Sequence, residues 1–419
     1  MEIKRICSLI DERKEELFDL LSSFIKINSE NFRDRGNEQA MAEQIYDICR
    51  ELGMESDLYS PLDIEGFEDH PDYIPNHHLE NRYNVTARWK GKEDTDALML
   101  MGHTDTVEIG DAANWNREPL SGDISEGKIW GRGAGDDKYA LAAALFVIKL
   151  LKEEGFEPKA NLLFSAYSDE EHGGSHGALA AVLKYPCKHI VNMDCKEGQI
   201  WHCGSGGQEI KYTYHTKETV DSAKLTARAI PVVMDILESF AENRRKELAE
   251  NRFYAGTCIP DTAFRYMGIM AGNKGNDLGV GEMHITYYTD KSKDEIYAEL
   301  AALEQVLTAR LAPMGIISDG FEPDTRFFHY VFCEPDSEDI KLMLEASREA
   351  AGQELLVCGS CLSDLSVISK YGSNLAYGFG MGRDFDKEGG AHQPNEFIEC
   401  DKFVDYTKTI AAYVIKMLG

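Results

Sequence analysis

Apolar residues recur at helical spacing in several long stretches of the chain. In residues 8–27, Leu17, Leu21 and Phe24 are three or four positions apart, as on one face of a helix. Residues 138–154 show the same spacing at Leu141, Leu145 and Ile148. The full pattern predicts helices at 8–27, 37–53, 138–154, 175–183, 221–248, 292–311, 337–351 and 401–418.

Short apolar runs between these helices predict strands. They lie at 84–89, 97–101, 161–166, 189–193, 208–216, 263–271, 281–289, 325–332 and 376–379. Up to residue 207, strands and helices alternate, which is typical of an α/β fold with a mostly parallel sheet covered by helices. Residues 208–331 change to the order β-α-β-β-α-β, typical of a separate α+β unit. We therefore expect one domain from 1–207 and 332–419, with 208–331 inserted as a second domain.

Composition and charge exclude several classes of protein. The 419 residues are 43% hydrophobic, enough for two cores, and carry a net charge of −29. Such an acidic surface repels phosphate backbones, so we expect no nucleic-acid partner. No run approaches the roughly 18 apolar residues of a membrane helix, so no membrane partner is expected. The ten cysteines are scattered, including Cys358-Gly-Ser-Cys361, and the N-terminus does not resemble a signal peptide, which together favour a cytoplasmic protein.

Side chains that bind metals follow several of the predicted strands. His103 and Asp105 are two residues apart after the run 97–101, so on an extended chain they leave the same face. The pair Glu170-Glu171 and the single Asp194 follow two further strands. Strand ends of an open α/β sheet meet at one edge, where ligands bind. With Asp136 after a glycine loop and a second histidine, His392, these residues indicate a pair of divalent metal ions.

Three motifs have alternative interpretations. Gly131-Arg-Gly-Ala-Gly135 resembles a dinucleotide-binding loop, but Asp136 and Asp137 follow it directly and would repel a pyrophosphate. They suit a metal site or a helix cap instead. The acidic turn 168–174 is either a metal-binding loop or a solvated surface turn. We interpret His77-His78 as part of a surface loop within 58–83, because no acidic residue lies at ligand spacing from them.

Taken together, these motifs resemble the M20 family of two-zinc metallopeptidases and deacylases. The matching segments are Gly-His-Thr-Asp (102–105), Gly-Arg-Gly-Ala-Gly-Asp-Asp-Lys (131–138), Asp-Glu-Glu-His-Gly-Gly (169–174), Asn-Met-Asp (192–194) and Ala-His-Gln-Pro-Asn-Glu (391–396). The resemblance implies a cytoplasmic amide hydrolase that removes an acyl group from an N-acyl amino acid or a related amine. A dipeptidase or carboxypeptidase acting on short peptides is the alternative, and a catalytically silent homologue is disfavoured by the complete motif set.

The resemblance also implies roles for individual residues. Two Zn²⁺ ions, with Co²⁺ or Mn²⁺ as substitutes, would be held by the following groups: one by His103 and Asp194, the other by Glu171 and His392, with Asp136 bridging both. Asp105 would accept a hydrogen bond from the distal nitrogen of His103 and so orient it. Glu170 would be the general base and then the general acid. The peptide bond Asp136–Asp137 would be cis.

The inserted domain departs from the family pattern. By resemblance it would be a lid or dimerisation domain, which implies a homodimer. The usual lid histidine is absent from residues 219–222, although His215 and His284 lie elsewhere in the domain. Asn276 matches the lid's usual asparagine. The usual lid arginine is also absent, which leaves three other candidates for binding a substrate carboxylate: Arg265, Arg326 and Arg383.

Overall fold

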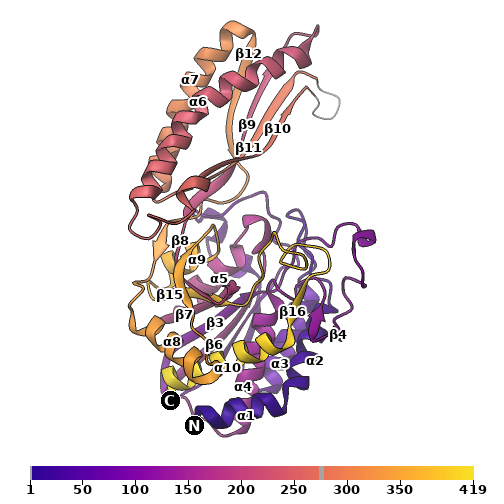
Figure 1. Ribbon diagram of the computed structural model, residues 1–419, viewed down its shortest axis with the longest axis vertical. Coiled ribbons are helices and arrows are strands. Elements are labelled where there is room, and N and C mark those ends of the chain that lie inside the picture. Colours follow the sequence, from indigo (N-terminus) through magenta and orange to yellow (C-terminus); the bar gives the residue numbers. More distant parts are fainter. Residues whose placement is uncertain (1, 273–277) are drawn as a thin grey trace. The chain divides into compact units, whose positions relative to one another are not determined.

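The computed structural model describes residues 2–272 and 278–419 and divides into two compact units (Figure 1). The first unit comprises Met1–Cys203, Phe332–Cys358 and Val367–Gly419. The second comprises Gly204–Val331 and Gly359–Ser366. The first unit is therefore assembled from three separate stretches of chain.

A nine-stranded sheet forms the centre of the first unit. In spatial order its strands are β1 (Glu55–Tyr59), β2 (Asn84–Trp89), β6 (Ala160–Tyr167), β3 (Glu93–His103), β7 (His189–Glu197), β15 (Ala376–Gly380), β8 (Gln199–Gly204) and β13 (Val331–Phe332), with β14 (Leu356–Ser360) also paired to β8. The four central strands β6, β3, β7 and β15 are parallel. The α/β fold with a mostly parallel sheet is thus confirmed.

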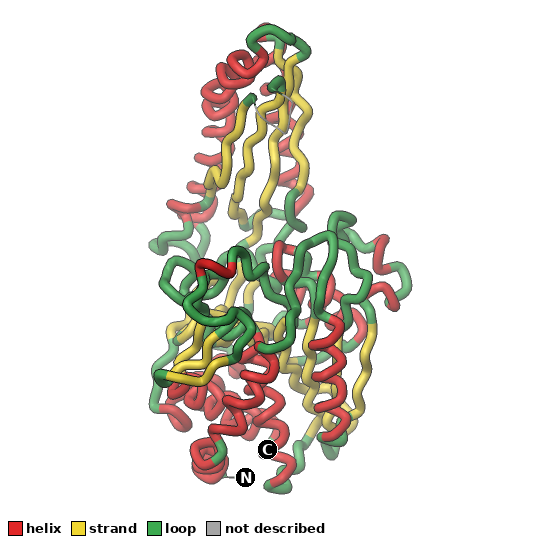
Figure 2. Tube along the Cα trace, turned by 90° about the vertical axis from the view of Figure 1, so that its right-hand side faces the viewer, coloured by secondary structure: helices red, strands yellow, loops and turns green. Residues whose placement is uncertain are grey.

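Both faces of this sheet are buried, which explains its continuous apolar runs. Along β3, Leu98 and Leu100 join the core beneath the helices, while Met99 and Met101 alternate to the opposite face and are also buried. The helices of the first unit are α1 (Ile3–Glu12), α2 (Lys14–Ile25), α3 (Gln39–Glu51), α4 (Lys138–Glu153), α5 (His176–Lys184), α8 (Glu338–Ala351) and α10 (Cys400–Leu418) (Figures 1 and 2). Along the chain, the second unit ends and the first resumes within the short α9 (Leu365–Val367).

Several details of the first unit differ from the sequence prediction, and two of them concern the first helix and a small sheet. The single helix expected at 8–27 is two helices, because the backbone of Arg13 leaves the helical conformation and its guanidinium binds Glu16. A small sheet was not predicted: β4 (Asp123–Ser125), β5 (Lys128–Trp130) and β16 (Phe397–Glu399) pair antiparallel. This sheet joins the chain just before the glycine loop to the chain just after His392.

The second unit is a four-stranded antiparallel sheet with two long helices. Its elements are β9 (Gly206–Thr216), α6 (Ser222–Glu250), β10 (Phe264–Ala271), β11 (Val280–Thr289), α7 (Lys293–Leu311) and β12 (Ile316–Pro323), and the strand order is β10-β11-β9-β12. Of the strand predicted at 325–332, only Val331–Phe332 forms a strand, β13 of the nine-stranded sheet; the fourth strand of the second unit is β12, and residues 325–329 are buried without forming a regular strand. An apolar run buried in irregular chain gives the same sequence signal as a strand.

Candidate metal centre

The sheet of the first unit brings His103, Asp194 and the acidic turn with Glu171 to one edge. His103 is the last residue of β3, and the acidic turn begins one residue after β6 ends at Tyr167. His103 and Tyr167 are paired in register between these parallel strands. Asp194 lies in β7, the other parallel neighbour of β3. The side chains converge because parallel neighbours end at the same edge.

Two groups of metal-binding atoms share one carboxylate. His103, Asp136 and Asp194 offer ligand atoms within 4.8 Å of one another, and so do Asp136, Glu171 and His392. The Nε2 atom of His103 lies 2.9 Å from Oδ1 of Asp136. The Nε2 atom of His392 lies 3.2 Å from Oδ2 of Asp136 and 3.0 Å from Oε2 of Glu171. The five predicted metal ligands are therefore brought together, with Asp136 between the two histidines.

The electrostatics of this cluster favour added positive charge. Burial disfavours the charged form of His103, but hydrogen bonds with Asp105 and Asp136 raise its pKa well above the usual value. For His392, burial is likewise outweighed by Glu171 and Asp136, which raise its pKa to about 11. Burial opposes ionisation of Asp136, yet the two histidines lower its pKa. A donor set of two imidazoles and three carboxylates fits divalent cations.

Asp105 contacts both His103 and the backbone of the acidic turn. The Nδ1 atom of His103 lies 3.0 Å from the backbone oxygen of Asp105 and 3.6 Å from its Oδ1. The carboxylate of Asp105 accepts hydrogen bonds from the backbone N–H groups of Glu170, at 3.1 Å, and Glu171, at 3.0 Å. Asp105 thus connects His103, a predicted metal ligand, with Glu170, the predicted general base.

The glycine loop and the His392 loop are joined by a buried ion pair. Nη1 of Arg132 lies 2.6 Å from Oε2 of Glu396, and the two side chains are 3% and 1% exposed. Arg132 also donates to the backbone oxygen of His392, and Glu396 accepts from the backbone N–H of Gly135. The peptide bond between Asp136 and Asp137 is cis, as expected.

A buried network around Asp169 was not found from the sequence. The surface-loop interpretation is wrong for His77, which is 1% exposed and lies 2.8 Å from Oδ1 of Asp169. The other carboxylate oxygen contacts His176, and Arg82 donates to Oδ1. The Nε2 atom of His176 accepts from the backbone N–H of Ile74, so its Nδ1 carries the proton. With its oxygens occupied by these donors and a guanidinium, Asp169 is an anchored carboxylate rather than a cation site.

The arginines and histidines considered for substrate binding have partners inside their own units. Arg265 donates to the hydroxyl of Tyr288, and the buried Arg326 contacts Asp364. The remaining contacts pair Arg383 with Glu399, His215 with Asp319, and His284 with Glu282. Asn276 lies outside the described residues. Beside the metal centre, the ring of Phe385 is 54% exposed and its centroid lies 4.8 Å from that of His392.

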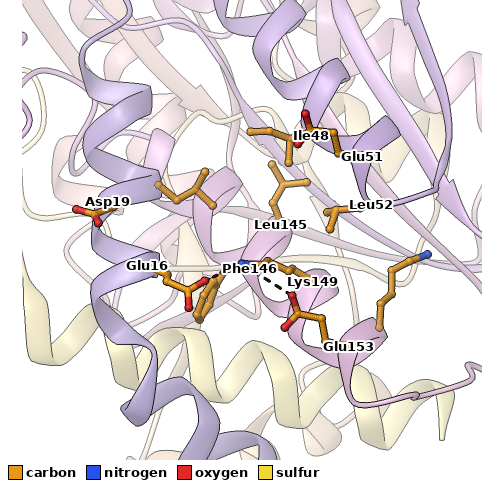
Figure 3. A pocket seen from close by; sticks show the side chains of 11 residues that line it. Glu16, Asp19, Ile48, Glu51, Leu52, Leu145, Phe146, Lys149 and Glu153 are labelled. Carbon is orange, nitrogen blue, oxygen red and sulfur yellow. Dashed lines mark hydrogen bonds and ion pairs between the residues drawn. The ribbon is translucent and has the colours of Figure 1, made fainter.

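A groove of about 830 Å³ lies elsewhere in the first unit, among α2, α3 and α4 (Figure 3). Its lining includes the apolar Leu52 and Phe146 and the ion pair between Lys149 and Glu16. None of the predicted metal ligands lines it. We therefore assign no chemistry to this groove.

The fold and the site together define the class of protein. A mostly parallel sheet that gathers two histidines around a shared carboxylate is the architecture of a metallohydrolase. The chain belongs to the peptidase family M20/M25/M40, whose model matches residues 99–416. It is accordingly a metallohydrolase that acts on amide bonds, as the resemblance implied.

The relatives carry different names within this family. The N-formyl-4-amino-5-aminomethyl-2-methylpyrimidine deformylase of Halalkalibacterium halodurans is 24% identical over 98% of this chain and 96% of its own length. The succinyl-diaminopimelate desuccinylase of Wigglesworthia glossinidia brevipalpis is 38% identical over 26% of this chain and 28% of its own. The structure of human carnosine dipeptidase 1 matches with a TM-score of 0.70 at 14% identity, covering 99% of both chains. At that identity the likeness concerns the fold.

Among the described helices, none has the length and apolar character needed to cross a membrane.

Proposed function

We propose that the protein is a two-zinc deacylase that removes an acyl group from an N-acyl amino acid or a related amine. The observation that carries this proposal is the position of Asp136 between two histidines, each with a further carboxylate. The name of the deformylase that aligns over 98% of the chain supports acyl removal. A dipeptidase or carboxypeptidase is the second candidate, because the fold also matches that of a carnosine dipeptidase.

In this proposal five side chains hold the metals. His103 and Asp194 would hold one ion, Glu171 and His392 would hold the other, and Asp136, which belongs to both ligand groups, would contribute to both sites. Zinc suits this mixture of imidazole and carboxylate ligands, with cobalt or manganese as substitutes. Bound ions of this kind supply Lewis acidity, which lowers the pKa of water and polarises the amide carbonyl.

The chain's own groups then move the proton. Glu170 belongs to neither ligand group and is partly exposed beside Glu171. Its carboxylate accepts a proton from the attacking water and later returns it to the departing amine nitrogen. Asp105 keeps Glu170 in place through the backbone N–H groups of the acidic turn, and its contacts with His103 fix the ring that binds the first ion.

The second unit, Gly204–Val331 with Gly359–Ser366, is proposed as the lid or dimerisation domain of a homodimer. Its self-contained core supports a separate role. A cytoplasmic location is proposed because the ten cysteines are free thiols, which is typical of a reducing compartment.

A substrate screen with defined metal tests the proposal. The metal-stripped protein, reloaded with Zn²⁺, is assayed on N-formyl, N-acetyl and N-succinyl amino acids and on unblocked dipeptides. We expect N-acyl amino acids to be cleaved with the higher kcat/KM. Preference for unblocked dipeptides would favour the second candidate, and metal-independent cleavage would refute both.

The Glu170→Gln variant tests the mechanism. It keeps the size of the side chain but cannot accept the proton. We expect a loss of kcat of about 10²- to 10⁴-fold, with the metal content of the wild type by elemental analysis. A kcat within about threefold of the wild type would rule out Glu170 as the base.

A further inference from the structure

The acidic turn that carries Glu170 and Glu171 has an unfavourable backbone. Two of its residues with a Cβ atom adopt the left-handed conformation, Asp169 with φ 60° and His172 with φ 60°, and so does Ser175, directly after the turn, with φ 58°. The turn lies between the end of β6 and the start of α5 and contains only a short 3-10 turn, Glu171–Gly173. Its conformation must therefore be held by contacts from other segments.

Asn31 lies at the centre of those contacts and is completely buried. Its Nδ2 donates to Oδ2 of Asp105 at 2.8 Å and to Oδ1 of Asp169 at 3.2 Å. Its Oδ1 accepts from Nη2 of Arg82 at 3.0 Å and from the backbone N–H of Arg33 at 2.9 Å. Nδ2 also donates to the backbone oxygen of Glu171 at 3.5 Å. Because Oδ1 faces only donors and Nδ2 faces only acceptors, a single orientation of the amide fits.

The backbone of Asn31 is fixed as well. Its N–H donates to the backbone oxygen of Thr106 at 2.9 Å, next to Asp105. Its backbone oxygen lies 3.1 Å from Nε2 of His172, inside the acidic turn. Asn31 therefore contacts both the segment after β3 and the segment after β6.

The amide of Asn31 determines how the carboxylate of Asp105 is turned. Both oxygens of Asp105 accept from consecutive backbone N–H groups, those of Glu170 and Glu171. Nδ2 of Asn31 is a donor that Asp105 and Asp169 share. Without it, the two buried carboxylates would repel each other more strongly, and this repulsion would favour rotation of the Asp105 carboxylate. Rotation of Asp105 would release the N–H of Glu170.

We propose that Asn31 is a positioning residue that holds Glu170 in its working geometry through Asp105. This inference rests on the proposed role of Glu170 as the base. Displacement of a catalytic group by about 1 Å can reduce turnover about 10²-fold without a comparable change in substrate binding. Asn31 touches neither substrate nor metal in this role.

Asn161 provides a matched control. It is also a buried asparagine, 1% exposed, whose Nδ2 donates to two carboxylates, those of Asp94 and Asp96, and whose Oδ1 accepts from the backbone N–H of Gly91. It is the second residue of β6, at the opposite end of that strand from the acidic turn. Its replacement removes a similar set of hydrogen bonds far from the proposed base.

The experiment compares Asn31→Leu with Asn161→Leu at saturating zinc, measuring kcat, KM, bound metal and Tm. Both variants should lose stability. Only Asn31→Leu should lose kcat, by about 10²-fold, with KM within about threefold of the wild type. A kcat equal to that of Asn161→Leu would overturn the proposal. If Asn31→Leu does not fold, Asn31→Asp keeps the side-chain size and the acceptor for Arg82, and the same loss of kcat is expected.

The Glu170→Gln background separates positioning from general destabilisation. Where Glu170 cannot accept a proton, adding Asn31→Leu should lower the residual kcat less than about threefold, because the two changes remove one function. A full 10²-fold further loss would overturn the proposal. Wild-type turnover of Glu170→Gln alone would instead rule out Glu170 as the base, and absent cleavage in the substrate screen would refute the proposed function, so these failures are distinguishable.

Discussion

Replacing Arg132 with methionine should test the ion pair that joins the two metal-binding loops. The variant leaves Glu396 buried without its cation. At 2.6 Å and an effective dielectric constant of about 20, the attraction is about 6 kcal/mol, and desolvation offsets part of it. Removing one partner of such a pair typically costs about 3–5 kcal/mol. We expect a loss of this size in the free energy of unfolding of the first unit.

Urea denaturation followed by tryptophan fluorescence measures this loss, because the four tryptophans lie at 89, 115, 130 and 201, in the first unit. The measurement is made with a chelator present, so that metal binding does not contribute. Arg117→Met is the control: Arg117 pairs with Asp123 in a more exposed pair, so its loss should be below about 1 kcal/mol. A loss for Arg132→Met no larger than that of the control would refute the reasoning.

The same variant has a defined pH dependence. Burial raises the pKa of Glu396, and Arg132 opposes that rise, so the methionine variant should have a still higher pKa at Glu396. A carboxyl whose pKa is raised on folding destabilises the folded state fully above the folded pKa. The penalty shrinks as the pH falls between the folded and the unfolded pKa, and it is absent below the unfolded pKa. The loss of unfolding free energy in Arg132→Met should therefore be larger at pH 8 than at pH 6. An equal loss at both pH values would contradict the raised pKa of Glu396.

Three further outcomes are expected. Chelation should lower Tm, because Asp136, Glu171 and Asp194 then repel one another without cations, and added zinc should restore it; a Tm unaffected by chelator would contradict the metal assignment. Asp136→Ala should lose both ions and His392→Ala only one, as counted by elemental analysis; equal losses would argue against a bridging carboxylate. Phe385→Ala should reduce kcat/KM for large apolar acyl groups about tenfold relative to formyl, since the half-exposed ring offers apolar surface beside His392; an unchanged ratio would exclude that contact.

The sequence was sufficient to predict the site residues that lie on regular strands. His103 and Asp194 could be placed together because each belongs to an apolar run, and neighbouring parallel strands bring such positions to one edge. Asp136 and His392 lie in loops, and it was the family resemblance rather than periodicity that assigned them to the same site. The structure brings all four close together.

The buried hydrogen-bond network around Asp169 could not be predicted in this way. His77 contacts Asp169 across 92 positions, and Arg82 contacts it across 87. No periodic pattern records a hydrogen bond between two irregular segments, so His77 looked like a surface residue. The prediction for residues 325–329 was wrong for a related reason: burial, and not pairing in a regular strand, accounts for their composition.

The order of the proposed ligands along the chain has a consequence for biosynthesis. Roughly 200 residues, including the whole inserted unit, separate Asp194 from His392. At typical synthesis rates of about 5–20 residues per second, the ribosome needs about 10–40 s to add them. During that interval a nascent chain carries His103, Asp136 and Glu171. It lacks the imidazole of His392, which completes the second group of metal ligands together with Asp136 and Glu171. Hydrolytic activity should therefore appear only after the segment that carries His392 has been synthesised and has left the ribosome.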